Sequence, residues 1–275
     1  MERRTAWAVA GVLGLVVLAL VAAAVFPLST SPPDRDAFSI ADAEDIDSFE
    51  LDGEITIDGE RFIALEASVK EDGARYSVTD GGDEGLYTES YQPHPEADIY
   101  ERTEGDKEHI DDIRERVLDD DDEEVVENGT KTLITVTNAT VPDRDGTGEV
   151  VVEDLMEDTL GSASFFVNSL YSTEYERAEK RDGVRVYEPQ SGWREGRNLY
   201  RISDTSGEVR VDAETGTLLS ADVSVSLTDA GSYAEYLAVR VLADDEVETM
   251  ETEYEFNGGD ADPEPPDWFD DVRAE

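Results

Sequence analysis

The sequence predicts an α+β domain, an antiparallel sheet of roughly ten strands with two helices, preceded by one N-terminal transmembrane helix. Three observations predict this class. Most of the chain beyond residue 46 alternates apolar and polar residues with period two, which is typical of strands that bury one face. Two segments instead repeat apolar residues every three or four positions, as amphipathic helices do. The N-terminus carries an uncharged apolar run long enough to cross a membrane.

The apolar run extends from Ala6 to Phe26 and holds no charged residue over 21 positions. As a helix it would span ~31 Å, which matches a hydrocarbon core of ~30 Å. Arg3 and Arg4 precede the run and acidic residues follow it, so the positive-inside rule places the N-terminus in the cytoplasm and the body outside the cell. The alternative is a cleaved signal peptide, for which Ala22-Ala23-Ala24 offers a cleavage site. Both interpretations export the body.

The first part of the body reads as a series of hairpins followed by a helix. Asp72-Gly73 is a strong hairpin turn between two period-two segments. The helix is predicted over 106–118, because Ile110, Ile113 and Val117 fall on one face. The strands predicted here cover 49–57, 63–69, 75–79, 86–91, 99–103 and 131–138.

A second, longer helix is predicted over 151–171, where apolar residues recur at three and four positions and form a face wide enough to lie across a sheet. The chain after it is predicted to consist of strands only. These cover 175–180, 184–187, 198–202, 208–212, 218–227, 233–242 and 247–256.

These elements divide the chain into an anchor or signal peptide (1–28), an acidic linker (29–45), an extracellular domain (46–258) and a C-terminal tail (259–275). Trp268 and Phe269 in the tail are expected to dock on the body, because a free apolar pair in a tail is unusual. The alternative to one domain is two similar halves that meet near residue 145.

The composition indicates a folded, salt-adapted protein. The chain carries 69 Asp and Glu against 22 Lys and Arg, a formal charge of −47, yet it is 39% hydrophobic and holds 22 aromatic residues. A disordered acidic chain would be poor in apolar residues. The acids are spread along the body and there are only four lysines, which favours a halophile, since molar salt shortens the Debye length to about 3 Å.

Several classes of function are not expected. Nucleic acid requires a basic patch, and none exists here. The chain contains no cysteine, so it has no thiolate metal site and no Cys nucleophile. His94 and His109 are the two histidines, and no G-x-S-x-G motif accompanies either. We therefore predict no catalytic residue, no metal site, no cofactor and no enzymatic activity. Asn128 and Asn138 begin N-x-[ST] sequons and are candidate glycosylation sites for an exported body.

Two short motifs carry a family resemblance. The segment from Val209 to Leu218 reads VRVDAETGTL, and the tail contains Pro266-Asp267-Trp268-Phe269. With its successive hairpins and helix-bearing middle, the chain resembles the lipoprotein-carrier (LolA-like) half-barrel superfamily. It resembles more closely the acidic surface proteins of haloarchaea that end in a P-x-W-F tail. The resemblance covers about residues 45–269 by layout.

The resemblance implies a curved sheet, a half-barrel, wrapped around helices with an apolar cavity between them. The implied function is a surface-tethered binding protein that holds an apolar ligand such as a lipid; the alternative is a structural or sensory envelope protein that acts through protein contacts. The candidate cavity residues are Leu155, Leu160, Ala163, Phe166, Val167, Tyr76, Tyr87 and Tyr200, all of which would otherwise be ordinary core residues. The partners expected are the membrane, through Ala6 to Phe26, an apolar ligand and other envelope proteins.

Overall fold

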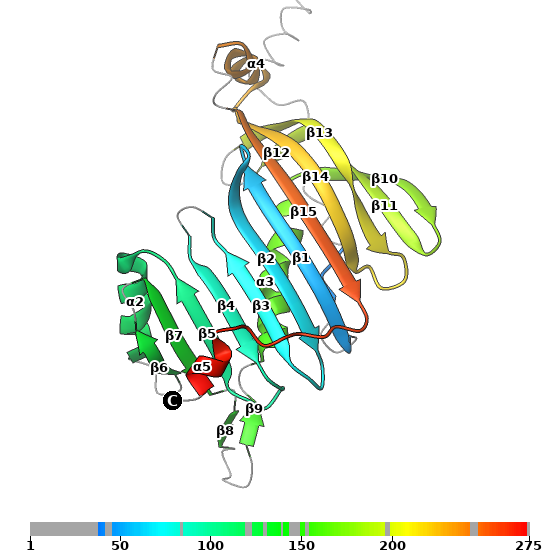
Figure 1. The fold of residues 1–275 in the computed structure, drawn as a ribbon. Coiled ribbons are helices and arrows are strands. Elements are labelled where there is room, and N and C mark those ends of the chain that lie inside the picture. Colours follow the sequence, from blue (N-terminus) through cyan, green and yellow to red (C-terminus); the bar gives the residue numbers. More distant parts are fainter. Residues whose placement is uncertain are drawn as a thin grey trace, which may run out of the picture.

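A curved, open antiparallel sheet forms the body of the protein (Figure 1). The computed structural model describes residues 38–41, 46–82, 85–118, 123–128, 131–138, 140–142, 149–151, 154–195, 199–242 and 247–273. Within them the strand order is β10-β11-β13-β14-β15-β1-β2-β3-β4-β5-β7-β6, with β12 paired to β13. The predicted α+β class is therefore confirmed.

The strands of this sheet are β1 (Ser48–Ile57), β2 (Glu60–Lys70), β3 (Arg75–Asp80), β4 (Tyr87–Gln92), β5 (Ile99–Glu104), β6 (Glu123–Asn128), β7 (Thr132–Thr137), β10 (Glu174–Arg181), β11 (Val184–Gln190), β12 (Gly192–Glu195), β13 (Leu199–Asp212), β14 (Leu218–Asp229) and β15 (Val247–Gly258). Two short strands, β8 (Thr140–Pro142) and β9 (Glu149–Val151), pair separately. Strands β1 and β15 pair from Phe49↔Gly258 to Ile57↔Met250, and this pairing joins the first and last strands into one continuous sheet.

The four helices of the described residues occupy four different places. Helix α3 (Leu155–Leu170) lies on one face of the sheet, which we call the inner face. Helix α2 (Lys107–Leu118) packs against β6 and β7 at the sheet edge, α4 (Tyr233–Leu242) projects beyond the end of β14, and α5 (Phe269–Arg273) ends the described chain. Of the two helices that the sequence predicted, α3 crosses the inner face of the sheet, whereas α2 packs against β6 and β7 at its edge.

The core lies between α3 and the inner face. The buried residues of α3 are those that the three-and-four periodicity selects: Leu155, Met156, Thr159, Leu160, Ala163, Phe166, Val167 and Leu170. Gly53 in β1 allows the closest contact, since a methyl group on it would lie 2.9 Å from the Phe166 ring. The helix begins later than predicted, at the N-cap Asp154, whose side chain accepts a hydrogen bond from the Met156 backbone N–H at 2.8 Å.

Residues 233–242 form helix α4, so the prediction of a strand there was wrong. Ser232 and Glu235 explain the difference. The Glu235 backbone N–H donates to the Ser232 hydroxyl at 3.2 Å, and the Gly231 N–H donates to the Glu235 carboxylate at 2.7 Å. This S-x-x-E arrangement satisfies the free backbone N–H groups of a helix start and selects the helix.

The C-terminal tail crosses the outer face of the sheet, opposite α3 (Figure 1). Phe269 is 5% exposed and packs edge-on against Tyr91 and Tyr100, with ring centroids 4.7 and 4.9 Å away. The Trp268 indole N–H donates to the Glu89 carboxylate at 2.7 Å. The tail thus covers β4 and β5 from the side that α3 does not.

The predicted anchor, Ala6 to Phe26, lies outside the described residues. Within the part of the chain that the structure describes, no helix is both long enough and apolar enough to cross a membrane.

Candidate functional site

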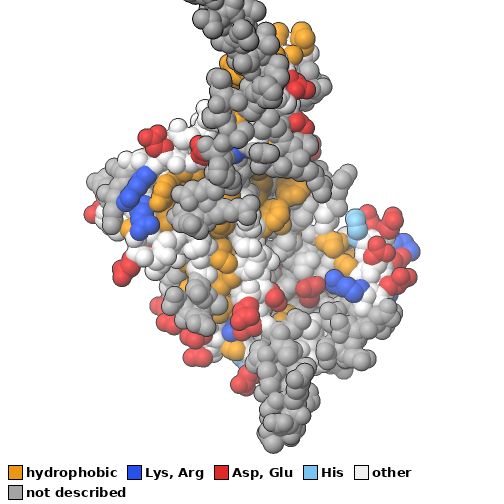
Figure 2. Space-filling model, turned by 180° about the vertical axis from the view of Figure 1, so that it is seen from behind, with side chains coloured by type: hydrophobic (Ala, Val, Ile, Leu, Met, Phe, Trp, Pro, Cys, Tyr) orange, Lys and Arg blue, Asp and Glu red, His pale blue; other side chains and the backbone are white. Residues whose placement is uncertain are grey.

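Two grooves run along α3, one on each side of it. The larger has a volume of about 920 Å³ and lies between α3, residues 39–41 and Ile46, and the turn from β13 to β14. The smaller has a volume of about 520 Å³ and lies between α3 and strands β2 and β3. Figure 2 shows this face of the molecule, where apolar side chains gather in the middle and acidic side chains lie toward the margin.

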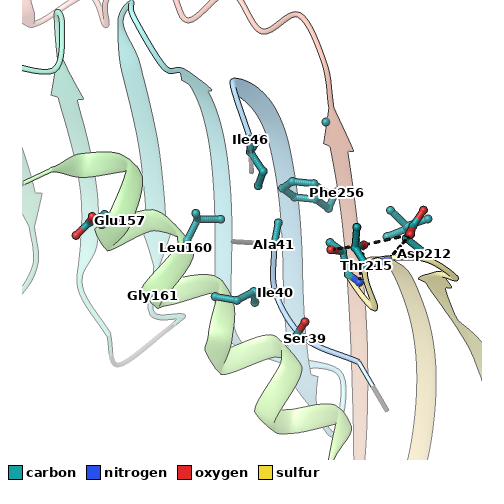
Figure 3. A pocket seen from close by; sticks show the side chains of 13 residues that line it. Ser39, Ile40, Ala41, Ile46, Glu157, Leu160, Gly161, Asp212, Thr215 and Phe256 are labelled. Atoms are coloured by element: carbon teal, nitrogen blue, oxygen red, sulfur yellow. Dashed lines mark hydrogen bonds between the residues drawn. The ribbon is translucent and has the colours of Figure 1, made fainter. Parts of the chain in front are cut away.

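The larger groove has an apolar floor and a polar rim (Figure 3). Leu160 of α3 points toward Ile40 and Ala41, and Phe256 of β15 lies beside Ile46. Leu219 completes the apolar lining. The rim is polar and comprises Ser39, Glu157, Asp212, Thr215 and Thr217.

The segment 38–41 is hydrogen-bonded to the sheet and forms one wall of this groove. The Ser39 N–H donates to the Gly216 carbonyl at 3.0 Å, and the Leu218 N–H donates to the Ser39 carbonyl at 2.8 Å. Phe38 is 3% exposed and stacks on Tyr171, with ring centroids 4.9 Å apart. The packed body therefore includes residues that the sequence assigned to the acidic linker.

The VRVDAETGTL motif forms the turn on the opposite wall. Asp212 accepts hydrogen bonds from the backbone N–H groups of Glu214 and Thr215, both at 2.8 Å, and Gly216 adopts a φ of +82°. These bonds hold the pKa of the Asp212 carboxyl below its usual value. The Asp and Gly of this motif are thus required by the turn, and the turn sets the position of Thr215 and Thr217 on the rim.

The smaller groove is lined by Phe165 and Phe166 of α3 and by Ile63 and Leu65 of β2. Phe165 is 44% exposed and stacks on Phe62, with ring centroids 6.1 Å apart. Asp158 lies at its edge, where burial, together with the nearby Asp154 and Glu157 carboxylates, raises its pKa above 3.8. Both grooves therefore combine an apolar floor with carboxylates at the mouth.

A buried polar network fixes the N-terminal end of α3. Arg75 in β3 is 2% exposed, donates to the Asp154 carboxylate at 2.5 Å and donates to the Gln92 side-chain oxygen at 3.0 Å. The same Gln92 oxygen accepts from the Leu155 N–H at 3.3 Å. A buried charge that is paired and hydrogen-bonded is costly to disrupt, so this network holds α3 in one position between the grooves.

The structure brings together only part of the predicted cavity. Leu160 lines the larger groove and Phe166 the smaller, while Leu155, Ala163 and Val167 are buried core residues. Tyr200 is partly buried against the same core.

Tyr76 and Tyr87 lie on the outer face and do not contact the grooves. The Tyr76 hydroxyl donates to the Glu89 carboxylate, at 3.0 Å, beneath the tail. Tyr87 lies beside Glu89 of its own strand and directly opposite Glu104 of β5. Alternation correctly places Tyr76 and Val78 on one face of β3, but it does not indicate which face carries the helix.

Sequence reasoning missed the groove residues Ile40, Ile46, Leu219 and Phe256. Phe256 and Leu219 belong to predicted strands, and nothing in the sequence distinguishes a strand residue that lines a groove from one that is buried in the core. The sequence did contain a signal at Phe38-Ser39-Ile40-Ala41. Three apolar residues within an acidic segment indicate that the segment packs against the body.

The remaining candidates do not line either groove. Asn138 is exposed after β7, whereas the side chain of Asn128, the last residue of β6, is outside the described set. His94 and His109 are exposed and lie in different elements. Among the described residues, no group of three or more His, Asp or Glu side chains is arranged to hold a metal ion.

No protein-family model and no curated protein sequence matches this chain, so the grooves are interpreted from their own geometry.

Proposed function

We propose that this protein is a surface-tethered binding protein that holds an apolar ligand of the lipid class beside α3. The observation that carries the proposal is the pair of grooves, about 920 and 520 Å³ in volume, with apolar floors on a helix held in place at its end. Sites for small apolar molecules have volumes of about 300–1,000 Å³ and combine an apolar lining with a few polar groups.

The charge at the groove mouths restricts the ligand class. Glu157 lines both grooves, Asp212 stands on the rim of the larger and Asp158 on that of the smaller. Among the described residues that line the two grooves, none is a lysine or an arginine. A carboxylate or phosphate head group would meet like charge there. The preferred ligand therefore has an uncharged or cationic polar end.

The sequence supports the proposed membrane tether and the proposed environment, outside the cell in molar salt. The run Ala6 to Phe26 is the proposed membrane anchor, and the charge of −47 suits an exported protein that works in molar salt. A protein held at the bilayer surface has a high local concentration of lipid, which favours occupancy of a shallow groove.

Photolabelling tests the ligand. Membranes that contain the full chain would be loaded, in molar KCl, with a diazirine-bearing fatty alcohol or with the fatty acid of equal length, and irradiated. We expect crosslinked peptides from 38–46 and 155–168, with more label from the alcohol than from the acid. Label confined to residues 1–37 would contradict the proposal, because the anchor alone would then contact lipid.

Gly161 provides a matched pair of variants, because it lines both grooves and no heavy atom lies within 4 Å of a methyl group placed on it. Gly161→Trp should fill the grooves and reduce the label in 155–168 several-fold. Gly161→Ala should retain the label. Equal labelling of both variants would place the ligand elsewhere.

A further inference from the structure

Three tyrosines beside the larger groove surround a side chain from the N-terminal part of the body. Tyr171 follows α3, Tyr175 lies in β10 and Tyr187 lies in β11. Their ring centroids lie 4.9, 5.4 and 6.2 Å from the centroid of Phe38, and we call the three residues the tyrosine cage. Phe38 is 3% exposed, so the cage is filled by a residue of the same chain.

The segment that carries Phe38 is joined to the sheet through one residue pair. We call residues 38–41 the strap. Ser39 pairs with Thr217 in an isolated parallel bridge that consists of two backbone hydrogen bonds. Even the short β12 pairs over a longer stretch, from Gly192 to Glu195. A segment with so few backbone hydrogen bonds can open locally while the rest of the sheet stays folded.

The tyrosine cage is more polar than a phenyl ring requires. The Tyr171 hydroxyl donates to the backbone carbonyl of Phe38. The Tyr175 hydroxyl is buried and has no hydrogen-bond partner among the described residues. Burying a hydroxyl without a partner is costly, and a phenylalanine at position 175 would fill the same space without that cost. The Tyr175 hydroxyl therefore indicates a partner that the strap does not supply.

The surroundings of the Tyr175 hydroxyl restrict the chemistry of that partner. Burial raises the pKa of this hydroxyl above its ordinary value, so it stays protonated and can both donate and accept a hydrogen bond. Arg194 of β12 is 3% exposed and lies near enough to Tyr175 to act on it electrostatically. A cationic group would meet like charge there. The cage therefore suits an uncharged polar group that can hydrogen-bond.

The strap separates the tyrosine cage from the larger groove. Ser39, Ile40 and Ala41 line the groove, whereas Phe38 at the start of the strap fills the cage (Figure 3). Displacement of the strap would join the two spaces. The deep end of the combined site would then present the hydroxyls of Tyr171 and Tyr175.

We propose that the strap is a displaceable plug, and that Phe38 leaves the tyrosine cage when an uncharged polar end of the ligand enters it. The inference rests on the proposed function and narrows its ligand to a long-chain alcohol or another lipid that ends in a hydroxyl. Phe38 occupies the cage as such an end would, with an apolar group between the rings and an oxygen on the Tyr171 hydroxyl. The ligand adds a hydrogen bond to Tyr175, and this difference shifts the strap toward its displaced state.

A reversible crosslink tests the displacement. The chain has no cysteine, so Ser39→Cys with Thr217→Cys offers one disulfide between directly paired residues. Membranes that contain the full chain would be loaded, in molar KCl, with a long-chain alcohol that carries a diazirine beside its hydroxyl. In the reduced form we expect label on the peptides that contain the tyrosine cage. In the oxidised form of the same protein this label should fall several-fold and move to 155–168, because the polar end then stays at the groove mouth.

Tyr175→Phe tests the hydroxyl while leaving the size of the ring unchanged. Label on the cage from the alcohol should fall several-fold, and circular dichroism in molar KCl should match that of the original chain. A hydrocarbon of equal length with the same diazirine is the control ligand, and it should label the cage weakly in both proteins. A purely structural role of Tyr175 would not distinguish the alcohol from the hydrocarbon.

Three outcomes would overturn the proposal. Absence of label from both 155–168 and the tyrosine cage would remove the proposed function and the plug together. Label on 155–168 without label on the cage, in the reduced form, would remove the plug alone. Cage label of equal strength in the oxidised and reduced forms would show that the ligand reaches the tyrosines without displacing the strap.

Discussion

The two halves of the sheet differ in what covers them, because α3 packs on the inner face from β15 to β4, across both halves, whereas the tail docks on the outer face of one half. We call the strands from β10 to β2 in the sheet order the core half and those from β3 to β6 the tail half. One row of directly opposed residues on the inner face crosses both, from apolar to polar. In order from β15 to β7 it reads Phe256, Leu51, Ala67, Ser77, Ser90, Glu101 and Thr135.

At the polar end of this row, the side chains of the inner face form hydrogen bonds with one another. Ser90 and Thr103 both donate to the Glu101 carboxylate, at 3.3 Å. The aromatic residues of the tail half point to the outer face, where Tyr91 and Tyr100 receive Phe269. The tail half thus obtains apolar cover on its outer face from the tail, while α3 packs on the inner face of β15, β1, β2, β3 and β4.

The outer face of the core half is acidic where the tail does not cross it. Asp52 lies opposite both Glu255 and Glu66, and Glu253 lies opposite both Glu54 and Asp222. Like charges directly opposed on neighbouring strands are destabilising. Where a strand pair is uncovered, its outer side chains can be charged in molar salt; where the tail covers it, they must be aromatic or paired.

The largest expected effect is loss of structure at low salt, beginning in the core half. Dialysis from molar to millimolar KCl lengthens the range of repulsion between the opposed carboxylates. We expect the far-ultraviolet circular dichroism of the body to decrease and amide exchange to rise first in β1 and β15.

A charge-matched pair tests this cause. Asp52→Asn with Glu253→Gln should retain structure at lower salt than Asp72→Asn with Glu264→Gln, which removes the same charge from exposed sites elsewhere. Unchanged circular dichroism of the original chain between the two salt concentrations would count against the salt-adapted interpretation.

The core half should be strongly sensitive to Phe166→Ala. Phe166 is fully buried against Tyr254, with ring centroids 6.1 Å apart, so its truncation should lower the free energy of unfolding by about 4 kcal/mol. The neighbouring Phe165→Ala, at a site 44% exposed, should cost less than about 1 kcal/mol. Urea titration in molar salt measures both, and equal costs would mean that α3 is not packed as described.

The tail half should be sensitive to Phe269→Ala, with a loss of about 2 kcal/mol, because the tail can detach and limit the cost. We expect faster amide exchange in 259–273 and in β4 and β5, with β1 and β15 unchanged. Asp271→Asn, at an exposed site on the same short helix, serves as the control. A parallel loss of protection in β1 would show that the halves are not separate.

The smallest effect is electrostatic and lies at Asp158. Its raised pKa means that the folded state binds the proton more tightly than the unfolded state, so stability falls as pH rises from 3.8 through the folded pKa. Asp158→Asn removes this cost and should raise the neutral-pH melting temperature slightly, with the difference shrinking below pH 3.8. A difference that grows as the pH falls would refute this sign.

The sequence predicted the elements whose patterns are strong and local. Helix α3 and its buried face follow from apolar residues that recur every three or four positions, because only a helix places residues at that spacing on one face. The prediction of a strand at 233–242 was wrong because YAEYLAVRVL fits both the period of two residues of a strand and the period of 3.6 residues of a helix. The cap at Ser232 favours the helix. The long strand β13 was predicted as two strands, 198–202 and 208–212. The gap between them coincides with the place where the register of β13 against β14 shifts, between Ser203 and Ser206.

The candidate site was predictable only in part. Leu160 and Phe166 were found because they lie on α3, but Ile40 and Ile46 reach the groove through pairing of Ser39 with Thr217, a contact between residues far apart in the chain. Tyr76 and Tyr87 were assigned to the wrong side of the sheet, because alternation defines two faces and leaves open which of them a helix will cover.

By itself, the sequence determined which residues share a face, where α3 lies along the chain, and how much charge the surface carries, because these depend on local period and composition. Only the tertiary structure decided that α3 covers the inner face from β15 to β4 and that the tail docks on the outer face of β4 and β5. That choice depends on contacts such as Phe166 with Gly53 and Phe269 with Tyr91, which join segments that no local pattern connects.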